Sequence, residues 1–174
     1  MATSGLDKLL SWVLLIAVVA AIGLTVVLSQ LPPREEPFTE FYLLGNDGIA
    51  EDYPFDLRAG QGQPVIMGIT NHEGAPASYV VEVWAAHETI VASTNRTHVD
   101  SMTQIGTVRV DLLDGQTYEQ PYQVTVSDKD ANKVEFLLFF QAPEKVGSVP
   151  PASMSGQDRV DAAYRNVNLW IAVN

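Results

Sequence analysis

An acidic stretch, Asp128-Lys129-Asp130-Ala131-Asn132, carries side-chain oxygens at alternate positions, as the start of an EF-hand calcium loop does. The pattern then departs from that loop: Lys133 stands where the sharp turn requires glycine, and Phe139 stands where the bidentate glutamate is required. Two interpretations remain open. Asp128, Asp130 and Asn132 bind a calcium ion loosely, or the stretch is a hairpin turn between two strands. We expect the turn, and no cofactor.

The three histidines, His72, His87 and His98, do not form a zinc-binding pattern. A zinc site needs three or four converging ligands. His72 and His87 each precede a glutamate, but neighbouring residues on a strand point to opposite faces of the sheet. Such a doublet does not bind one ion without a bend in the strand. The sequence therefore favours histidines on a solvated surface.

The triplet Asn71-His72-Glu73 stands where a predicted strand gives way to a turn. Asparagine stabilises turns by hydrogen bonding to backbone groups nearby, and His72 and Glu73 are placed to hold the loop that follows. The triplet therefore indicates a structural corner. A binding site formed by Asn71, His72 and Glu73 is the alternative.

The sequence contains no pattern of nucleophilic catalysis. It has no cysteine, no Gly-x-Ser-x-Gly elbow and no glycine-rich phosphate loop, and acid pairs such as Glu35-Glu36 are typical of solvated surface. The aromatic residues Trp84, Tyr118 and Tyr122 are able to stack on a sugar, although aromatic residues in a β-sandwich belong more often to the core. We therefore expect a protein that is not an enzyme.

Leu9 to Leu28 is an uncharged, apolar run of about twenty residues, which as a helix is about 30 Å long and matches the hydrocarbon core of a bilayer. A cleaved signal peptide is the alternative. Its apolar part is usually only about 7 to 15 residues long, and the small-x-small pattern of a cleavage site is poor around Ser29-Gln30-Leu31. The sequence favours one retained transmembrane helix, in contact with the membrane through residues 9–28.

The orientation in the membrane rests on few residues. Positively charged residues are usually in excess on the cytoplasmic side of a membrane helix. Lys8 is the only base before the helix, and Arg34 lies beside Glu35 and Glu36 after it, so this rule barely distinguishes the two orientations. Asn95-Arg96-Thr97 matches the acceptor pattern for N-glycosylation, which would place Asn95 outside the cell. We expect a short N-terminal tail inside and an extracytoplasmic C-terminal domain.

Charge and cysteine content exclude several classes of protein. The formal net charge is −11, and Asp7 and Lys8, the only charges before the apolar run, cancel each other. The whole excess of acid therefore follows the helix, which disfavours nucleic acid and anionic lipid surfaces as partners. Without cysteine, a lipidated-cysteine anchor and a disulfide framework are excluded.

Beyond the helix, the pattern changes to short alternating segments separated by Gly, Asp and Asn. We expect a tail and helix at 1–31, a proline-rich linker at 32–37 and one domain at 38–174, an antiparallel β-sandwich. Strands are expected at 38–44, 53–57, 64–71, 78–85, 88–93, 107–113, 120–126, 134–141 and 166–173, with 64–71 paired to 78–85.

Two stretches of the domain fall outside these strands. Val99 to Gln104 is compatible with a helical turn, and no segment after the linker shows a convincing helical period. Glu144 to Gln157 is rich in Pro, Ser and Gly and is expected to be an exposed loop before the last strand. Long loops on a rigid sandwich are where contacts tend to lie, and a plain surface insertion is the alternative.

Six stretches give the chain a resemblance to a known family. They are Phe38–Gly45, Tyr53-Pro54, Gly68–Glu73, Tyr79–Val83, Val134–Leu138 and Tyr164–Trp170. On these residues the chain resembles an archaeal family of predicted membrane proteins, the domain of unknown function 1616. Its members look like multi-helix membrane proteins with an outer β-domain, whereas this chain has one predicted helix and a longer loop at Glu144 to Arg159. The resemblance implies a fold and a location, and no activity.

The predicted fold class is all-β: an immunoglobulin-like antiparallel β-sandwich preceded by one transmembrane α-helix. The predicted function is that of a non-catalytic, membrane-anchored, extracytoplasmic accessory subunit of a cell-envelope complex. Its partner is another envelope protein or a second copy of the chain, and not a nucleic acid. A structural subunit of a surface filament or layer is one alternative, and a sugar- or ligand-binding accessory domain is the other.

Overall fold

The computed structural model describes residues 3–30, 36–93, 96–143 and 145–174 of the chain. These residues divide into two compact units, Met1–Glu36 and Pro37–Asn174. Residues 32–35 of the expected linker and the glycosylation candidate Asn95 lie outside the described residues.

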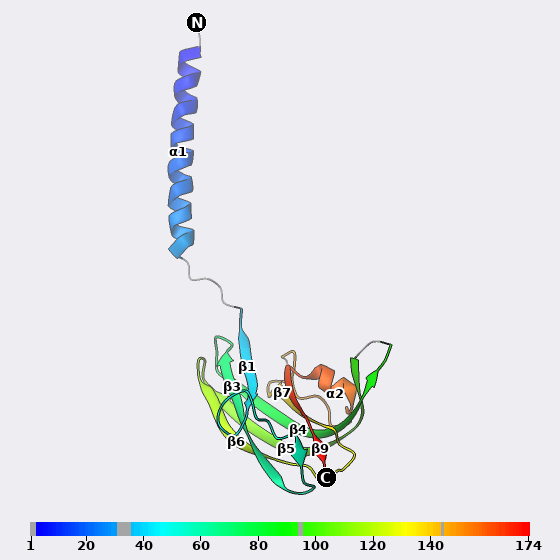
Figure 1. The fold of residues 1–174 in the computed structure, drawn as a ribbon. Coiled ribbons are helices and arrows are strands. Elements are labelled where there is room, and N and C mark those ends of the chain that lie inside the picture. Colours follow the sequence, from blue (N-terminus) through cyan, green and yellow to red (C-terminus); the bar gives the residue numbers. More distant parts are fainter. Residues whose placement is uncertain (1–2, 31–35, 94–95, 144) are drawn as a thin grey trace. The chain divides into compact units, whose positions relative to one another are not determined.

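The first unit contains helix α1, Thr3–Gln30 (Figure 1). Ser11 Oγ donates to the Asp7 carbonyl oxygen at 2.8 Å, and Thr25 Oγ1 donates to the Ala21 carbonyl oxygen at 2.9 Å. Both hydroxyls are thus satisfied within the helix, as a lipid environment would require. The helix is long and apolar enough over Asp7–Ser29 to cross a membrane, a property that signal sequences near the N-terminus share.

The second unit consists of two antiparallel sheets packed face to face (Figure 1). The first sheet has the order β1 (Phe38–Leu44), β3 (Gly62–His72), β6 (Thr117–Thr125). The second has the order β5 (Arg96–Leu112), β4 (Ala77–Val91), β7 (Lys133–Phe140), β8 (Arg165–Trp170). A short parallel pair joins β2 (Asp56–Leu57) to β9 (Ala172–Val173). In immunoglobulin terms these are strands A-B-E against C′-C-F-G, so the predicted fold class is confirmed.

The core lies between the two sheets and follows the two-residue period of the strands. Val81 of β4 faces Leu138 of β7, and Val83 faces Phe136, and all four side chains are fully buried. Facing residues of an antiparallel pair share one side of the sheet, so these pairs form a continuous apolar surface. Burying each such large side chain contributes about 1.5–3 kcal/mol, which makes this layer the main source of stability.

All eight residues of β7 are buried, because the outer face of its sheet is covered as well. The cover is the segment between β7 and β8, which includes helix α2 (Gln157–Ala162). Phe140 N–H donates to the Gly147 carbonyl oxygen at 2.8 Å, and Val149 N–H donates to the Phe140 carbonyl oxygen at 3.2 Å. The prediction of an exposed loop over 144–157 is therefore only partly right. Its outer side is exposed, but backbone bonds fasten it to the sheet.

Other sequence predictions about the strands are wrong. Residues 88–91, expected to begin a separate strand, continue β4. Segments 64–71 and 78–85 do not pair, because β3 lies between β1 and β6 while β4 lies between β5 and β7. Both strands are rich in apolar residues, so their alternation identifies them as strands without identifying their neighbours. Val99 to Gln104 forms part of β5 and is not a helical turn.

Candidate functional site

The predicted corner at Asn71 is a buried centre of hydrogen bonds. Its Nδ2 donates to the carbonyl oxygens of Ala75 at 2.9 Å and Leu112 at 3.1 Å. Its Oδ1 accepts from the Glu73 N–H at 2.9 Å and from the Tyr79 hydroxyl at 3.2 Å. Both ends of the amide are therefore engaged in holding the turn.

Glu73 extends this network to two other elements, β1 and the start of β8. Its Oε1 accepts from the hydroxyl of Thr39 at 2.6 Å and from that of Tyr164 at 2.8 Å. The hydroxyls of Thr39 and Tyr79 are also bonded, at 2.9 Å. Burial raises the pKa of Tyr79 to about 12, so its hydroxyl keeps its proton. The network joins β1, β3, β4 and the start of β8, which favours the structural interpretation of Asn71 and Glu73.

His72 points away from the Asn71 network, as the alternation along β3 requires. Its ring stacks on Phe38 with the centroids 4.7 Å apart, and its Nε2 lies 3.6 Å from Glu40 Oε1 on the partly exposed face. The three residues of the triplet therefore do not converge on one position. A binding site formed by them stays a prediction that the geometry does not support.

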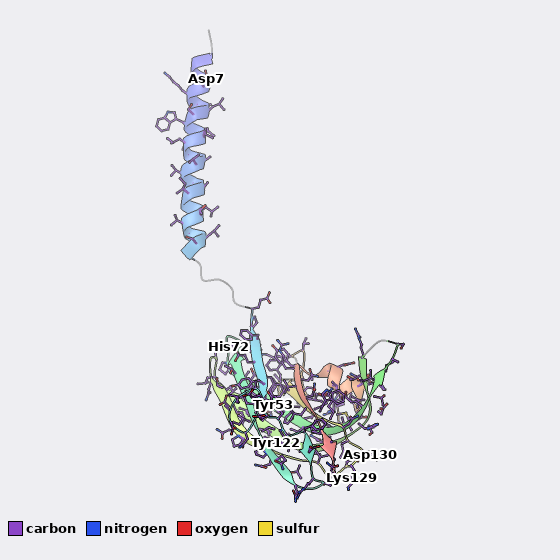
Figure 2. The ribbon with its side chains drawn as sticks, in the orientation of Figure 1. Asp7, Tyr53, His72, Tyr122, Lys129 and Asp130 are labelled. Carbon is purple, nitrogen blue, oxygen red and sulfur yellow. The ribbon has the colours of Figure 1, made fainter. Side chains whose placement is uncertain are left out.

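The acidic stretch after β6 connects the two sheets, whereas a hairpin turn would join neighbouring strands. Asp128 Oδ1 accepts from the Asp130 N–H at 3.0 Å. The side chain of Asn132 points toward β4. Its Oδ1 accepts from the Glu88 N–H at 2.9 Å, and its Nδ2 donates to the Glu88 carbonyl oxygen at 2.8 Å. Figure 2 shows Lys129 and Asp130 at one end of the sandwich and His72 at the other. Within the described ranges, no three His, Asp or Glu side chains are arranged to hold a metal ion.

The aromatic residues considered for sugar stacking are packed within the fold. Tyr122 packs edge-on against Phe136 with the ring centroids 5.8 Å apart, and Tyr118 is half-buried against the core. Trp84 lies on the other face of its sheet, where its Nε1 donates to Glu82 Oε2 at 3.1 Å. None of the three presents an exposed ring, so their structural role explains them.

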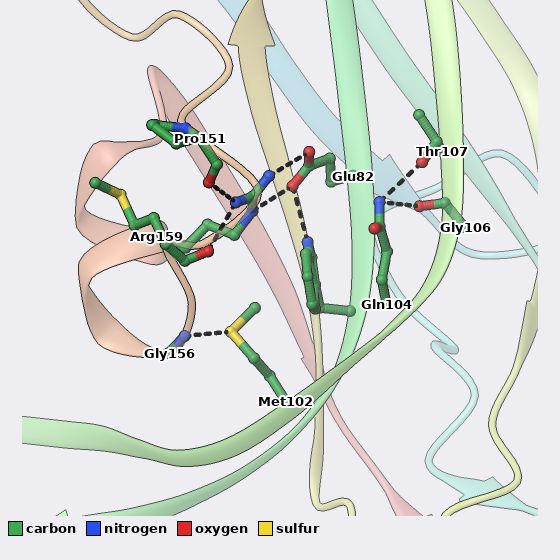
Figure 3. A network of polar contacts seen from close by, with 10 residues as sticks. Glu82, Met102, Gln104, Gly106, Thr107, Pro151, Gly156 and Arg159 are labelled. Carbon is green, nitrogen blue, oxygen red and sulfur yellow. Dashed lines mark hydrogen bonds and ion pairs between the residues drawn. The ribbon is translucent and has the colours of Figure 1, made fainter.

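A buried ion pair fastens the covering segment to the outer face of the second sheet (Figure 3). Arg159 of α2 donates from Nε to Glu82 Oε2 and from Nη2 to Glu82 Oε1, both at 2.7 Å. Its Nη1 donates to the carbonyl oxygens of Pro151 at 3.1 Å and Met154 at 2.8 Å. These bonds satisfy the guanidinium in a place where an unpaired charge would be costly.

A second buried cluster places one ammonium between two carboxylates. Lys133 Nζ lies 3.0 Å from Glu88 Oε2 and 2.7 Å from Glu135 Oε1. Among the described residues, Glu135 Oε2 has no hydrogen-bond partner. Burial raises the pKa of Glu135 to about 7, with Lys133 opposing that shift. The folded protein therefore holds the Glu135 proton more tightly than an exposed carboxyl group would.

An open groove of about 740 Å³ lies between β1 and β8, the edge strands on one side of the sandwich. Residues 41–43 form one wall, residues 167–170 form the other, and the segment 52–55 closes one end. Three aromatic side chains that line it are exposed: Tyr53 by 37%, Phe55 by 57% and Trp170 by 45%. The hydroxyl of Tyr53 donates to the Leu43 carbonyl oxygen at 2.9 Å, which fixes that ring against β1.

Sequence reasoning missed this groove because its walls come from three separate stretches. The available signal was Tyr53-Pro54-Phe55, two aromatic residues on either side of a proline in a short segment between turns. A proline interrupts strand pairing, so aromatic side chains beside it have fewer ways to enter a core. Exposed aromatic residues gathered in a groove are typical of binding surfaces.

Solved structures with a similar fold come from unrelated contexts. A CARDB domain from Pyrococcus furiosus, solved in complex with di-metal ions, has a TM-score of 0.44 and 10% identity, over 82% of this chain and 97% of that one. A β-glucosidase from Listeria innocua has a TM-score of 0.43 and 12% identity, over 79% of this chain and only 16% of the enzyme. A chain from the human complex of Zinc 2-glycoprotein and prolactin inducible protein has a TM-score of 0.37 and 8% identity, over 82% and 100%.

None of the curated proteins compared with the chain matches it. The model of one protein family does, from just after the helix almost to the last residue. On that match over residues 32–172, the chain belongs to the family called domain of unknown function 1616 (DUF1616).

Proposed function

We propose that this protein is a non-catalytic, membrane-anchored accessory domain that binds another protein of the cell envelope. In this proposal α1 stays in the membrane and the sandwich lies on the extracytoplasmic side. The observation that carries it is the combination of an exposed apolar helix of membrane length with a separately folded sandwich in one chain. A domain held at a membrane in this way meets other membrane proteins at a high local concentration.

The use of the polar side chains supports a binding role over a catalytic one. Asn71, Glu73 and Glu82 are engaged in bonds that hold the fold together, and each has partners from distant parts of the sequence. The aromatic rings of the groove, in contrast, are exposed on the surface. The net charge of −11 disfavours nucleic acid and anionic lipid, and exposed aromatic rings are enriched where proteins bind one another, which supports a protein partner.

The native mass of the protein after extraction in a mild detergent tests the accessory role. We expect the 19.0 kDa chain to migrate with a second membrane protein in a fixed ratio. A monomer with nothing attached would contradict the proposal. Very large assemblies released by shearing would contradict it too, in favour of a filament subunit.

Cysteine mapping tests the orientation, because the chain contains no cysteine of its own. Asn46→Cys places a thiol on an exposed turn of the sandwich, and Gly5→Cys places one near the N-terminal end of α1. In intact cells, a membrane-impermeant maleimide is expected to label Asn46→Cys and not Gly5→Cys. Permeabilised cells are the control, since both variants should then react. The reverse pattern in intact cells would place the sandwich inside.

A further inference from the structure

The two main sheets have four edges among the described residues, and those edges are protected unequally. On one side, β6 carries Pro121 in its middle, and β5 shows register shifts against β4 at Val83/Trp84 and His87/Glu88. Prolines and bulges are usual devices against further strand pairing. On the other side, β1 and β8 contain neither proline nor lysine and pair in unbroken register. The groove lies between these two edges. On β1 the Leu43 carbonyl oxygen is already bonded by the Tyr53 hydroxyl.

The hydrogen-bond ladder identifies the backbone groups of β8 that face this side. Ile171 N–H donates to the Asn132 carbonyl oxygen at 3.0 Å, so these two facing residues form a hydrogen-bonded pair. Hydrogen-bonded and non-hydrogen-bonded pairs alternate along an antiparallel ladder, so the next pair, Trp170 and Lys133, has no mutual hydrogen bonds. By alternation, Asn168 and Asn166 belong to pairs of the same kind. Their N–H and C=O groups therefore point away from β7, and no strand in the described part of the chain pairs with them.

The chain itself pairs with the continuation of this edge. Ala172 N–H donates to the Phe55 carbonyl oxygen and Asn174 N–H donates to the Leu57 carbonyl oxygen, both at 2.8 Å. The backbone N–H and C=O groups of residues 168, 170, 172 and 174 all point to the same side of the chain. β2 bonds residues 172 and 174, so it lies in line with the position that a strand added beside β8 would occupy. The segment before β2 leaves that line at Phe55, which lines the groove. An added strand would continue a pairing that β2 has started.

The side chains of the groove restrict what such a strand can carry. The exposed lining is largely aromatic, and the partly buried Phe41 and Val167 add apolar surface on either side. Among the described residues that line the groove, Asp52 is the only charged one. A strand with apolar side chains at alternate positions and a lysine or arginine near Asp52 fits this surface.

We propose that the outer edge of β8 accepts an extended segment of a partner polypeptide as an added β-strand within this groove. This inference rests on the proposed function, because it requires a protein partner. A row of alternating N–H and C=O groups is complementary to another extended backbone, and the apolar walls select alternate side chains. Pairing along Asn166 to Trp170 needs about five residues at about 3.3 Å each, or about 17 Å of strand.

A displayed library of ten-residue peptides tests this inference on the full-length protein in detergent micelles. Alternate positions of the library are Val, Ile, Phe or Tyr, and the others are randomised. Asn168→Pro removes an outward N–H and leaves the bonds between β7 and β8 intact. Gln123→Pro on β6 is the matched control, because Gln123 faces Pro64 and lies two residues beyond Pro121, at the same kind of outward position on a protected edge.

We expect selected peptides to bind the wild type and Gln123→Pro equally, and to bind Asn168→Pro at least about tenfold more weakly. Hydrogen exchange at the Asn166 and Asn168 amides should slow when the peptide is bound. If Asn168→Pro fails to fold, methylated peptides decide the matter on the wild type alone. In a bound strand, the N–H groups of every second peptide residue face β8 and the others point away from it. Methylating the backbone nitrogens that face β8 should abolish binding, and methylating those that point away should not.

Three results would overturn the proposal. They are a library that yields no binder, peptides that bind Asn168→Pro as tightly as the wild type, and binding that is indifferent to methylation of either set. A dimer joined through the β8 edge in the absence of peptide would assign that edge to a second copy instead. If the protein forms a stoichiometric envelope complex but binds no peptide, only this inference fails. If peptides bind but the extracted protein is a monomer, the proposed function fails.

Discussion

The guanidinium of Arg159 forms two 2.7 Å hydrogen bonds to the carboxylate of Glu82, across 77 residues of sequence. Glu82 is on the outer face of β4, and Arg159 belongs to the segment that covers that face. This pair explains how β7 can be buried on both sides in an antiparallel sheet. Antiparallel sheets commonly leave one face to solvent, and here the covering segment removes that face from water.

Breaking this pair from one side is expected to be costly. Arg159→Met leaves the Glu82 carboxylate buried without a cation and with the Trp84 Nε1–H as its remaining donor, so we expect a loss of about 3–5 kcal/mol in the free energy of unfolding, measured with urea. The double variant Glu82→Leu, Arg159→Met removes both charges and should recover much of that loss. The exposed Arg165→Met is the control and should change stability by less than about 1 kcal/mol. A double variant as unstable as the single one would show that packing of Arg159, and not charge pairing, is what matters.

The raised pKa of Glu135 predicts a dependence of stability on pH. Burial raises this pKa from its usual 4.5 to about 7, so the folded chain holds its proton more tightly than the unfolded chain. The contribution of this group to stability is therefore greatest below about pH 4.5 and falls as the pH rises to about 7, by about 1–3 kcal/mol. Glu135→Gln keeps the shape and cannot ionise.

The measurement is the free energy of unfolding of the wild type minus that of Glu135→Gln, from about pH 4 to about pH 8. Subtracting the variant removes the effect of the other carboxylates, which titrate in both proteins. We expect the difference to fall with rising pH and then to level off. A difference that rises with pH would mean that Lys133 lowers the pKa of Glu135 more than burial raises it.

The hydrogen bonds of Asn71 predict a structural cost when it is changed. Asn71→Asp keeps the size of the side chain and loses both donations, to Ala75 and Leu112. We expect a loss of about 2–4 kcal/mol in the free energy of unfolding, since the buried Leu112 carbonyl oxygen and the partly buried Ala75 carbonyl oxygen lose their donor and a charge is buried. His72→Ala, on the partly exposed face of the same strand, should cost less than about 1 kcal/mol. If Asn71→Asp and His72→Ala lowered the free energy of unfolding equally, the Asn71 hydrogen bonds would not be of special importance to stability.

Local patterns in the sequence were enough to predict the fold class. Tyr79, Val81 and Val83 stand at alternate positions and all belong to the core. The same two-residue period recurs along the domain, which identifies strands and a two-layer core. The sheet to which each strand belongs depends on contacts between distant residues, which no local pattern contains. Helix α2 has only six residues, too few for a helical period to appear.

The candidate site was predicted less well than the fold, for a related reason. Asn71 was predicted as a corner because its chemistry acts on its own backbone, within a few residues. The partnership of Arg159 and Glu82 and the groove at Tyr53, Phe55 and Trp170 depend on residues that only the fold brings together. Charged residues in a sequence are usually solvated, so nothing local distinguishes a buried pair from a surface one.

The contact between Gly68 and Tyr42 predicts that Gly68→Ala destabilises the wild type but not a variant that lacks the Tyr42 ring. The Tyr42 ring lies on the backbone of Gly68, and a Cβ added there would lie 2.1 Å from the ring carbon Cζ. The ring has little freedom to retreat, because its hydroxyl donates to Glu119 Oε2 at 2.7 Å. Gly68→Ala is therefore expected to lower the free energy of unfolding by about 1–3 kcal/mol.

In the background of Tyr42→Ala the obstruction is gone, and the same substitution should be neutral or stabilising by about 0.5 kcal/mol, because alanine loses less backbone entropy on folding than glycine. The four proteins form a double-mutant cycle measured by urea unfolding. Gly68→Ala costing the same in both backgrounds would mean that the ring moves aside, and Tyr42 would then not be a fixed wall of the groove.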